Sequence, residues 1–208
     1  ALAQQKLVIA HRGASGYLPE NTLPAFAMAH GLGCDWLELD VILSQDDQPI
    51  ILHDTYLDRL TDVNQRFPGR QRHDNLNYAL DFYLEELGQL RVSERRDQQE
   101  NSAFPRRFPQ GYSRFDIPTL AEVVQLIQGL NHSTGKKVGL LIEIKSPRWH
   151  HQQGRDLSQK VLEVLEHLSV NDNNCPIILE SFDAPEVKRL RYELKAEFPL
   201  LQLLEKTV

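Results

Sequence analysis

The chain has 208 residues, of which 41% are hydrophobic and 25% are charged, and its formal net charge is -6. This composition is typical of a single globular domain and excludes a disordered chain. The acidic balance without a Lys/Arg block argues against a nucleic-acid partner, and no apolar run approaches the roughly 20 residues of a membrane span, so we expect no stable membrane insertion.

The first elements of the chain predict a β-α-β unit. Residues 7–10 form a short apolar run that favours a buried strand. Thr22 is placed to cap a helix that ends near His30, and residues 36–43 favour a second strand. The connection between the two strands is long enough for them to pair in parallel.

The next strand-like run, residues 49–53, follows the second strand too closely to pair in parallel with it. Residues 44–48 cannot contain a parallel crossover, so we predict that the run folds back as a hairpin arm. This arrangement returns His53 to a position near the end of the second strand.

A loosely patterned segment, residues 54–116, then interrupts the alternation of strands and helices. It contains one amphipathic stretch, residues 80–90, that predicts a helix, and we interpret the whole segment as an insertion subdomain. Eight of its arginines are interpreted as a solvated surface, with an entry rim for anionic head groups as the alternative. They are Arg66, Arg70, Arg72, Arg95, Arg96, Arg106, Arg107 and Arg114.

Regular alternation resumes after the insertion and predicts a parallel sheet covered by helices. Doubly wound and barrel arrangements both fit the pattern, although five main strands are fewer than the eight of a closed TIM barrel. The expected strands are residues 138–145, 177–181 and 200–204, and the expected helices are residues 120–130, 157–168 and 185–197.

Charged side chains recur near the carboxyl ends of the predicted strands, where parallel α/β folds place their active sites. Glu38 and Asp40 are two residues apart in the second strand and therefore project to the same side. Glu143 and Lys145 have the same spacing in the third main strand. Burying carboxylates in such apolar runs is unfavourable unless something compensates their charge.

The residues alone leave two interpretations of these carboxylates. One is that Glu38 and Asp40 form salt bridges with Arg12 and Lys145. The other, which we favour, is a divalent cation held by Glu38, Asp40 and Glu143. Oxygen ligands without Cys or His favour Ca²⁺ or Mg²⁺ over zinc.

Four motifs resemble the glycerophosphodiester phosphodiesterase family. They are HRGASGYLPENT at 11–22, ELD at 38–40, HD at 53–54 and EIK at 143–145. The long segment after His53 and LNHSTGK at 130–136 look most like the periplasmic branch of that family. The resemblance implies a TIM barrel that hydrolyses glycerophosphodiesters to glycerol 3-phosphate and an alcohol with Ca²⁺ or Mg²⁺, calcium being usual in the periplasmic branch.

Position by position, the resemblance also implies roles for single residues. Glu38, Asp40 and Glu143 match the family's metal ligands, His11 and His53 match its acid–base pair, and Arg12 and Lys145 match its phosphate-facing cations. In the implied mechanism, one histidine deprotonates the substrate's own 2-hydroxyl, which attacks phosphorus, and the other protonates the leaving alcohol. Water then opens the cyclic phosphate with the two roles reversed.

The chain departs from the family pattern at its C-terminal end, because motifs of the later barrel strands are missing. We therefore expect residues 1–208 to be a single domain that forms an incomplete barrel, with the insertion after the hairpin arm. Exposed apolar sheet edges would lower its stability or cause self-association, so a homo-oligomer is a possible state. The small-x-small motif at residues 1–3 favours a periplasmic or secreted protein.

Several side chains near the predicted site have open interpretations. Phe182 either packs against the substrate glycerol or belongs to the core. His150 and His151 are interpreted as surface residues, with the leaving-group side of the pocket as the alternative, and Cys34 as a small buried thiol.

Two rival functions also remain. One is a related phosphodiesterase of lysophospholipid or sphingolipid head groups, which an exposed apolar lip would favour. The other is a binding protein on the same scaffold, which loss of a histidine or a carboxylate would favour. The sequence shows neither feature, and in either case we expect the ligand to be a small molecule.

Overall fold

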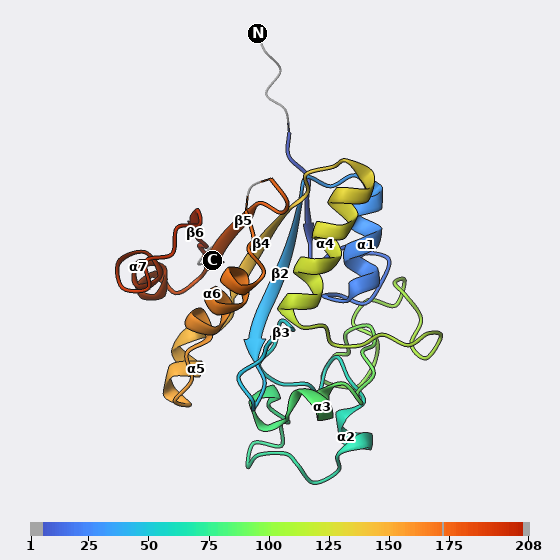
Figure 1. The fold of residues 1–208 in the computed structure, drawn as a ribbon. Helices are drawn as coiled ribbons and strands as arrows, with labels where there is room; N and C mark the ends of the chain where they lie inside the picture. Colours follow the sequence, from blue (N-terminus) through green and yellow to red (C-terminus); the bar gives the residue numbers. More distant parts are fainter. Residues whose placement is uncertain (1–5, 172, 206–208) are drawn as a thin grey trace.

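A six-stranded sheet forms the centre of the computed structural model, which describes residues 6–171 and 173–205 (Figure 1). The strand order is β1-β2-β4-β5-β6, all neighbours in this path are parallel, and β3 pairs antiparallel with β2. The strands are β1 (Ile9–His11), β2 (Trp36–Leu43), β3 (Pro49–Ile51), β4 (Gly139–Ile144), β5 (Ile177–Ser181) and β6 (Leu200–Gln202). The predicted parallel sheet and hairpin arm are therefore confirmed.

Helices follow the strands and cover the sheet, and Figure 1 shows α1 and α4 side by side on one of its faces. The helix α1 begins where predicted, because the Thr22 hydroxyl accepts a hydrogen bond from the amide of Ala25. The helices are α1 (Leu23–Leu32), α2 (Val63–Arg66), η1 (Ala79–Asp81), α3 (Leu84–Leu87), α4 (Leu120–Thr134), α5 (Pro147–Gln152), α6 (Leu157–His167) and α7 (Ala184–Tyr192). Among the described residues, no helix combines the length and the apolar character that crossing a membrane requires.

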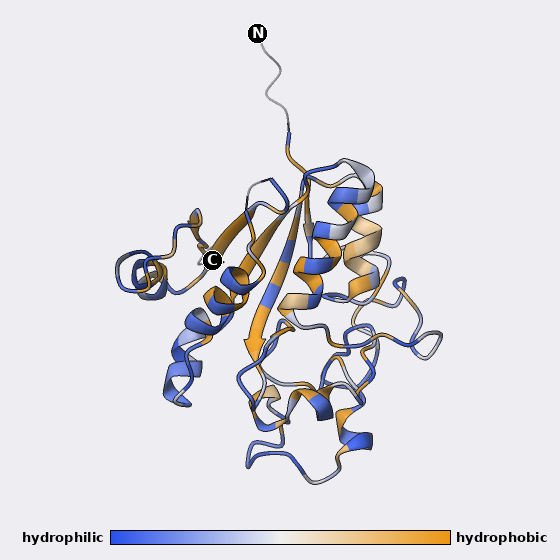
Figure 2. Ribbon diagram, viewed as in Figure 1, coloured by the Kyte–Doolittle hydropathy of each residue, from blue (hydrophilic) through white to orange (hydrophobic). Residues whose placement is uncertain are grey.

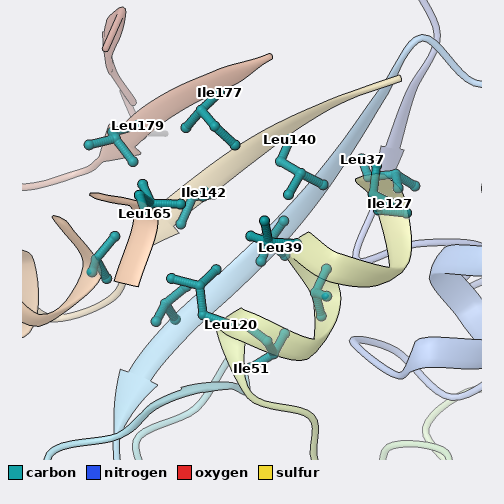
Figure 3. Packing of buried hydrophobic residues seen from close by; sticks show 14 of the residues in the cluster. Leu37, Leu39, Ile51, Leu120, Ile127, Leu140, Ile142, Leu165, Ile177 and Leu179 are labelled. Carbon is teal, nitrogen blue, oxygen red and sulfur yellow. The ribbon is translucent and has the colours of Figure 1, made fainter. Parts of the chain in front are cut away.

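The main hydrophobic core fills the space between the sheet and these helices (Figure 3). Leu37 and Leu39 of β2 pack there beside Leu140 and Ile142 of β4 and Ile127 of α4. Because side chains alternate along a strand, the even-numbered residues of β2 must face the opposite side of the sheet. In Figure 2, hydrophilic bands accordingly interrupt the hydrophobic colour of β2.

A second hydrophobic cluster lies within the segment 54–116 and on the hairpin that leads into it. Ile42 of β2 and Ile50 of β3 pack there against Leu57, Phe82 and Phe115, all of which are buried. In Figure 1 this segment forms the loops beyond the arrowhead of β2. Its assignment as an insertion subdomain of a single domain stays a prediction.

The continuous helix predicted over residues 80–90 is wrong. The structure has the short helices η1 and α3 instead, and Phe82 and Tyr83 between them have extended backbones. Phe82 is fully buried in the second cluster, and its carbonyl accepts a hydrogen bond from the Gln45 amide at 2.9 Å. These tertiary contacts outweigh the helical periodicity of the segment.

The sheet is open in the part of the chain that the structure describes, with β1 and β6 at its edges. Apolar side chains are exposed beside both strands, including Val8 at 57% and Leu201 at 44%. Both cysteines are buried and free, as predicted for Cys34. The expected self-association stays a prediction, and the motif at residues 1–3 lies outside the described residues.

The loop after β1 packs closely on α1 at Gly13. The backbone there is left-handed, with a φ of 76°, and a Cβ atom would lie 2.8 Å from the carbonyl carbon of Ala25. We expect Gly13→Ala to destabilise the fold through both backbone strain and this clash. Gly33 is the matched control, because its φ is 92° and a Cβ atom there would have no neighbour within 4 Å among the described residues.

The free energy of unfolding in urea checks this expectation. Gly33→Ala should lower it by about 1–2 kcal/mol through strain alone. Gly13→Ala should lower it by about 1–3 kcal/mol more, because the backbone of α1 cannot move aside easily. Equal effects at the two positions would contradict the packing described here.

Candidate active site

Two chain segments approach the same stretch of β2 from opposite directions. The strand β1 ends with His11 paired opposite Glu38. The strand β3 runs antiparallel along the same edge, and the Leu52 amide that follows it donates to the carbonyl of Asp40 at 3.0 Å. His11 and His53 are thereby brought to neighbouring positions beside Glu38 and Asp40. His53 lies beside the middle of β2 rather than at its end, because β3 runs back along the strand.

Three buried carboxylates meet on the face of the sheet opposite the main core. Oxygen atoms of Glu38, Asp40 and Glu143 lie within 4.8 Å of one another, and Asp40 pairs with Glu143 in the β2–β4 register. Burial, followed by the negative charge of Asp40, raises the pKa of Glu38 to about 8. Burial likewise raises the pKa of Glu143. The structure therefore brings together all three predicted ligands.

Within the described part of the chain, the predicted salt bridges are present for Asp40, whereas Glu38 forms none with Arg12 or Lys145. Arg12 Nε lies 3.3 Å from Asp40 Oδ2, and Lys145 Nζ lies 2.8 Å from Glu143 Oε1 and 3.6 Å from Asp40 Oδ1. These two cations do not compensate the whole cluster, which contains Glu38 as a third carboxylate. The two interpretations left open by the sequence are thus compatible with each other.

A divalent cation fits this group of residues. Asp40 is fully buried, and its Oδ1 atom has no hydrogen-bond partner among the described residues. The ligand atoms offered by Glu38, Asp40 and Glu143 are all carboxylate oxygens, the donors that a hard cation prefers. The acidic residues could therefore hold a metal ion, and their chemistry favours Ca²⁺ or Mg²⁺ over zinc.

The two histidines lie at the rim of the carboxylate cluster. His11 Nε2 is 3.8 Å from Glu38 Oε2, and its side chain is 68% exposed. Partial burial and the positive charge of Arg12 lower the pKa of His11. His53 Nδ1 is 2.6 Å from Asp54 Oδ1, which leaves Nε2 as the ring nitrogen for proton exchange. Both side chains can exchange protons with a substrate bound over the cluster.

A hollow of about 510 Å³ adjoins the cluster on the side of β4 and β5. Glu143, Lys145 and Phe182 line it. Phe182 is 50% exposed, and its ring centroid lies 5.9 Å from Lys145 Nζ. The core interpretation of Phe182 is therefore wrong, and its contact with a substrate stays a prediction.

Sequence reasoning missed four buried polar residues around the site. Asn21 donates to Asp40 Oδ2 at 2.8 Å. Glu180, 3% exposed, pairs with Glu143 in the β4–β5 register, and burial together with the charge of Glu143 raises its pKa to about 7. The other two, Glu20 and Arg95, form an ion pair at 2.7 Å. Glu180 carried the signal that had identified Glu38, namely a carboxylate within an apolar strand.

The interpretation of Arg95 as part of a solvated surface is wrong. The residue is only 8% exposed, and its guanidinium bonds Glu20 and Asp54. Its partners lie 75 and 41 residues away in sequence, so local pattern could not reveal this pairing.

The interpretation of His150 as a surface residue is also wrong. It is fully buried, its Nδ1 lies 3.0 Å from the carbonyl of Ser146, and its Nε2 accepts a hydrogen bond from the Leu43 amide at 3.3 Å. Burial lowers the pKa of His150 to about 4. The side chain of His151, by contrast, is 39% exposed, and its Nε2 lies 3.2 Å from Glu186 Oε2. Neither histidine lines the hollow beside Glu143.

The buried His150 predicts a loss of stability in mild acid. An unfolded chain binds a proton at this ring near pH 6.5, whereas the folded chain does so only near pH 4, so stability is fully present above pH 6.5 and falls as the pH drops toward 4. The shift corresponds to roughly 3 kcal/mol at most.

Urea unfolding of wild type and His150→Gln between pH 7 and 4.5 tests this expectation. The free energy of unfolding should depend less steeply on pH in the variant. His132→Gln, at an exposed position of α4, should behave as wild type, and identical slopes in all three would refute the assignment.

Comparison with known proteins decides the family. Residues 11–208 match the model of the glycerophosphoryl diester phosphodiesterase family. The chain belongs to this family. A glycerophosphodiester phosphodiesterase from Haemophilus influenzae is 42% identical over 93% of the chain, and one from Treponema pallidum is 36% identical over 95%. The chain spans about half the length of these curated relatives, 54% and 56% respectively.

Solved structures of glycerophosphodiester phosphodiesterases share the fold. One from Agrobacterium tumefaciens superposes with a TM-score of 0.63 at 21% identity, covering 94% of this chain and 66% of that one. An Oleispira antarctica phosphodiesterase in complex with the product sn-glycerol-3-phosphate gives a TM-score of 0.63 at 28% identity, covering 95% and 64%. Together with the open parallel sheet, these similarities confirm the expected TIM-type α/β fold, present here as an incomplete barrel.

Proposed function

We propose that this chain provides the catalytic residues for metal-dependent hydrolysis of glycerophosphodiesters to glycerol 3-phosphate and an alcohol. The observation that carries the proposal is the convergence of His11 and His53 on the buried cluster of Glu38, Asp40 and Glu143. Membership of the phosphodiesterase family and the product bound to the Oleispira antarctica relative support it.

The histidines would carry out the proton transfers of the reaction. One imidazole would take the proton of the substrate's 2-hydroxyl as its oxygen attacks phosphorus, and the other would protonate the leaving alcohol. The roles would reverse when water opens the cyclic phosphate. An imidazole ring can both accept and donate a proton near neutral pH, as these two opposite transfers require.

The remaining residues of the site would bind and orient the phosphate. Glu38, Asp40 and Glu143 would hold Ca²⁺, with Mg²⁺ as the alternative, and the ion would supply positive charge next to the phosphoryl oxygens. Arg12 and Lys145 would bind the same oxygens through their free donors. Phe182 would contact the glycerol or the alcohol from the adjoining hollow.

A coupled assay of glycerol 3-phosphate release from glycerophosphocholine tests the proposal. Release is expected with Ca²⁺ and should stop when a chelator is added. Lysophosphatidylcholine serves as the comparison substrate, and choline release is followed for both substrates, because hydrolysis of lysophosphatidylcholine at the same bond gives choline and lysophosphatidic acid rather than glycerol 3-phosphate. Faster choline release from it would instead support a lysophospholipid phosphodiesterase. No release from either substrate would reject catalysis by this chain.

The proposal includes a location and a state of assembly. The likeness of residues 54–116 and 130–136 to the periplasmic branch of the family supports a periplasmic or secreted protein that uses calcium. Exposed apolar residues at both sheet edges support a homo-oligomer. Cell fractionation and sedimentation velocity, respectively, check these two parts.

A further inference from the structure

Arg95 occupies a central position among the charged groups behind the site. It comes from the segment 54–116, far from the sheet in sequence, and yet its side chain is buried between two acidic residues of the site's own loops. Its Nη2 and Nε atoms bond the two oxygens of Glu20 at 2.7 and 3.1 Å, and its Nη1 bonds Asp54 Oδ2 at 2.6 Å. A single guanidinium therefore joins the loop after β1 to the loop after β3.

Each of these acidic residues in turn holds one functional side chain. The other oxygen of Asp54 lies 2.6 Å from Nδ1 of His53, and Glu20 Oε1 also accepts from Arg12 Nη1 at 2.9 Å. The result is a continuous chain of charge-assisted hydrogen bonds that runs from His53 through Asp54, Arg95 and Glu20 to Arg12. Such bonds are short and directional, and so they fix the orientation of both ends.

The pKa values of the two carboxylates in this hydrogen-bond series agree with its geometry. Although burial opposes it, the hydrogen bond from His53 and the charge of Arg95 lower the pKa of Asp54 to about 2. The hydrogen bond from Arg95, again against burial, lowers the pKa of Glu20. Both carboxylates are therefore ionised, and an ionised Asp54 keeps the proton of His53 on Nδ1.

We infer that Arg95 is a positioning residue that sets His53 and Arg12 in their working orientations relative to each other. The inference rests on the proposed function for the roles of these two side chains. It also assigns a task to the segment 54–116, which would supply the bridge between the proton-transfer group and the phosphate-binding group. Without Arg95, Asp54 and Glu20 would keep their negative charges and lose the cation that separates them.

The neighbouring Arg96 provides a matched control. Its guanidinium also lies partly buried, but it bonds the carbonyls of Asp58 and Thr61 and the carboxylate of Glu100, all within the same segment. Arg96→Met therefore disturbs the packing of the segment without touching the chain from His53 to Arg12. Arg95→Met removes the bridge with a side chain of similar length. Arg95→Lys keeps the charge, but an ammonium group cannot bond Glu20 and Asp54 at the same time with the geometry of a planar guanidinium.

Two readouts on the full chain separate positioning from folding. The first is kcat for glycerophosphocholine at saturating Ca²⁺, and the second is the ¹⁵N–¹H NMR signal of the His53 ring, assigned by its loss in His53→Ala. We expect Arg95→Met to lower kcat by about 30- to 100-fold and to shift the His53 signal, since small displacements of catalytic groups have effects of this size. Arg95→Lys should have a kcat and a His53 signal between those of Arg95→Met and wild type. Arg96→Met should leave kcat within about twofold of wild type and the His53 signal unchanged.

Equal losses of kcat in Arg95→Met and Arg96→Met at matched stability would overturn the inference, as would an unshifted His53 signal in Arg95→Met. If Arg95→Met does not fold, Arg95→Lys decides between the same outcomes. If the wild-type chain hydrolyses neither substrate, the proposed function fails, and the His53 signal alone then decides whether Arg95 positions this ring.

Discussion

His53→Ala and His11→Ala are each expected to abolish turnover of glycerophosphocholine while leaving Ca²⁺ bound. Both side chains lie at the rim of the carboxylate cluster rather than among its ligands, so their removal deletes proton transfer and not coordination. Loss of a general acid or base typically lowers a rate by 10²–10⁴-fold, and we expect kcat to fall by at least about 10²-fold in each variant. Calorimetry should give Ca²⁺ dissociation constants within about twofold of wild type.

The exposed His132 on α4 is the matched control for both histidines. His132→Ala should keep the kcat of wild type. A His11 or His53 variant that retains most of its kcat would remove that histidine from the mechanism, and a large loss of Ca²⁺ affinity would show instead that it contributes to the metal site.

Glu38→Gln is expected to weaken Ca²⁺ binding and to lower activity together. The variant keeps the shape of the side chain but cannot supply the negative charge that Glu38 takes on when it binds a cation, and Ca²⁺ affinity depends strongly on the charge of its ligands. We expect the dissociation constant to rise by about 100-fold, with kcat at low Ca²⁺ falling in parallel. Titration calorimetry and the glycerol 3-phosphate assay measure the two effects.

A second carboxylate cluster in the chain offers a control for this variant. His151, Asp156 and Glu186 also place possible ligand atoms within 4.8 Å of one another, but Arg189 already bonds both carboxylates of that group. Glu186→Gln should therefore leave Ca²⁺ affinity unchanged. If substitution at Glu38, Asp40 and Glu143 left the affinity equally unchanged, the assigned metal site would be wrong.

The elements that the sequence predicted best are two strands whose residues are almost all buried. Predominantly apolar runs predicted β2 (Trp36–Leu43) and β5 (Ile177–Ser181) with their observed bounds, because their pattern directly reflects burial. The helix predicted at residues 80–90 failed because Phe82 packs into a core that its local periodicity does not describe. Local pattern therefore predicts the sheet, and tertiary packing shapes the inserted segment.

The site residues also divide into those that local sequence pattern predicts and those that depend on tertiary contacts. Motif spacing predicted the cluster of Glu38, Asp40 and Glu143, since strand alternation and parallel register are enough to bring these residues together. Neither rule predicts the contacts of Arg95, whose partners Glu20 and Asp54 come from loops that precede and follow β2 in the sequence. The groups that support the reacting side chains are consequently harder to predict than those side chains themselves.

The strands β1 and β3 run in opposite directions along one edge of β2, and each leads to one of the two histidines. The spacing of the histidines therefore depends on the turn that sets the position of β3. Residues 44–48 set the register Val41↔Ile51. The turn is itself fixed by the Ser44 hydroxyl, which donates to Asp46 and accepts from the Gln48 amide. Adding or deleting one residue there would slide His53 along β2 by about 3.4 Å and turn it to the other side of the strand. The spacing of the two histidines thus depends on the length of the turn at residues 44–48, which lies outside the cluster of site residues.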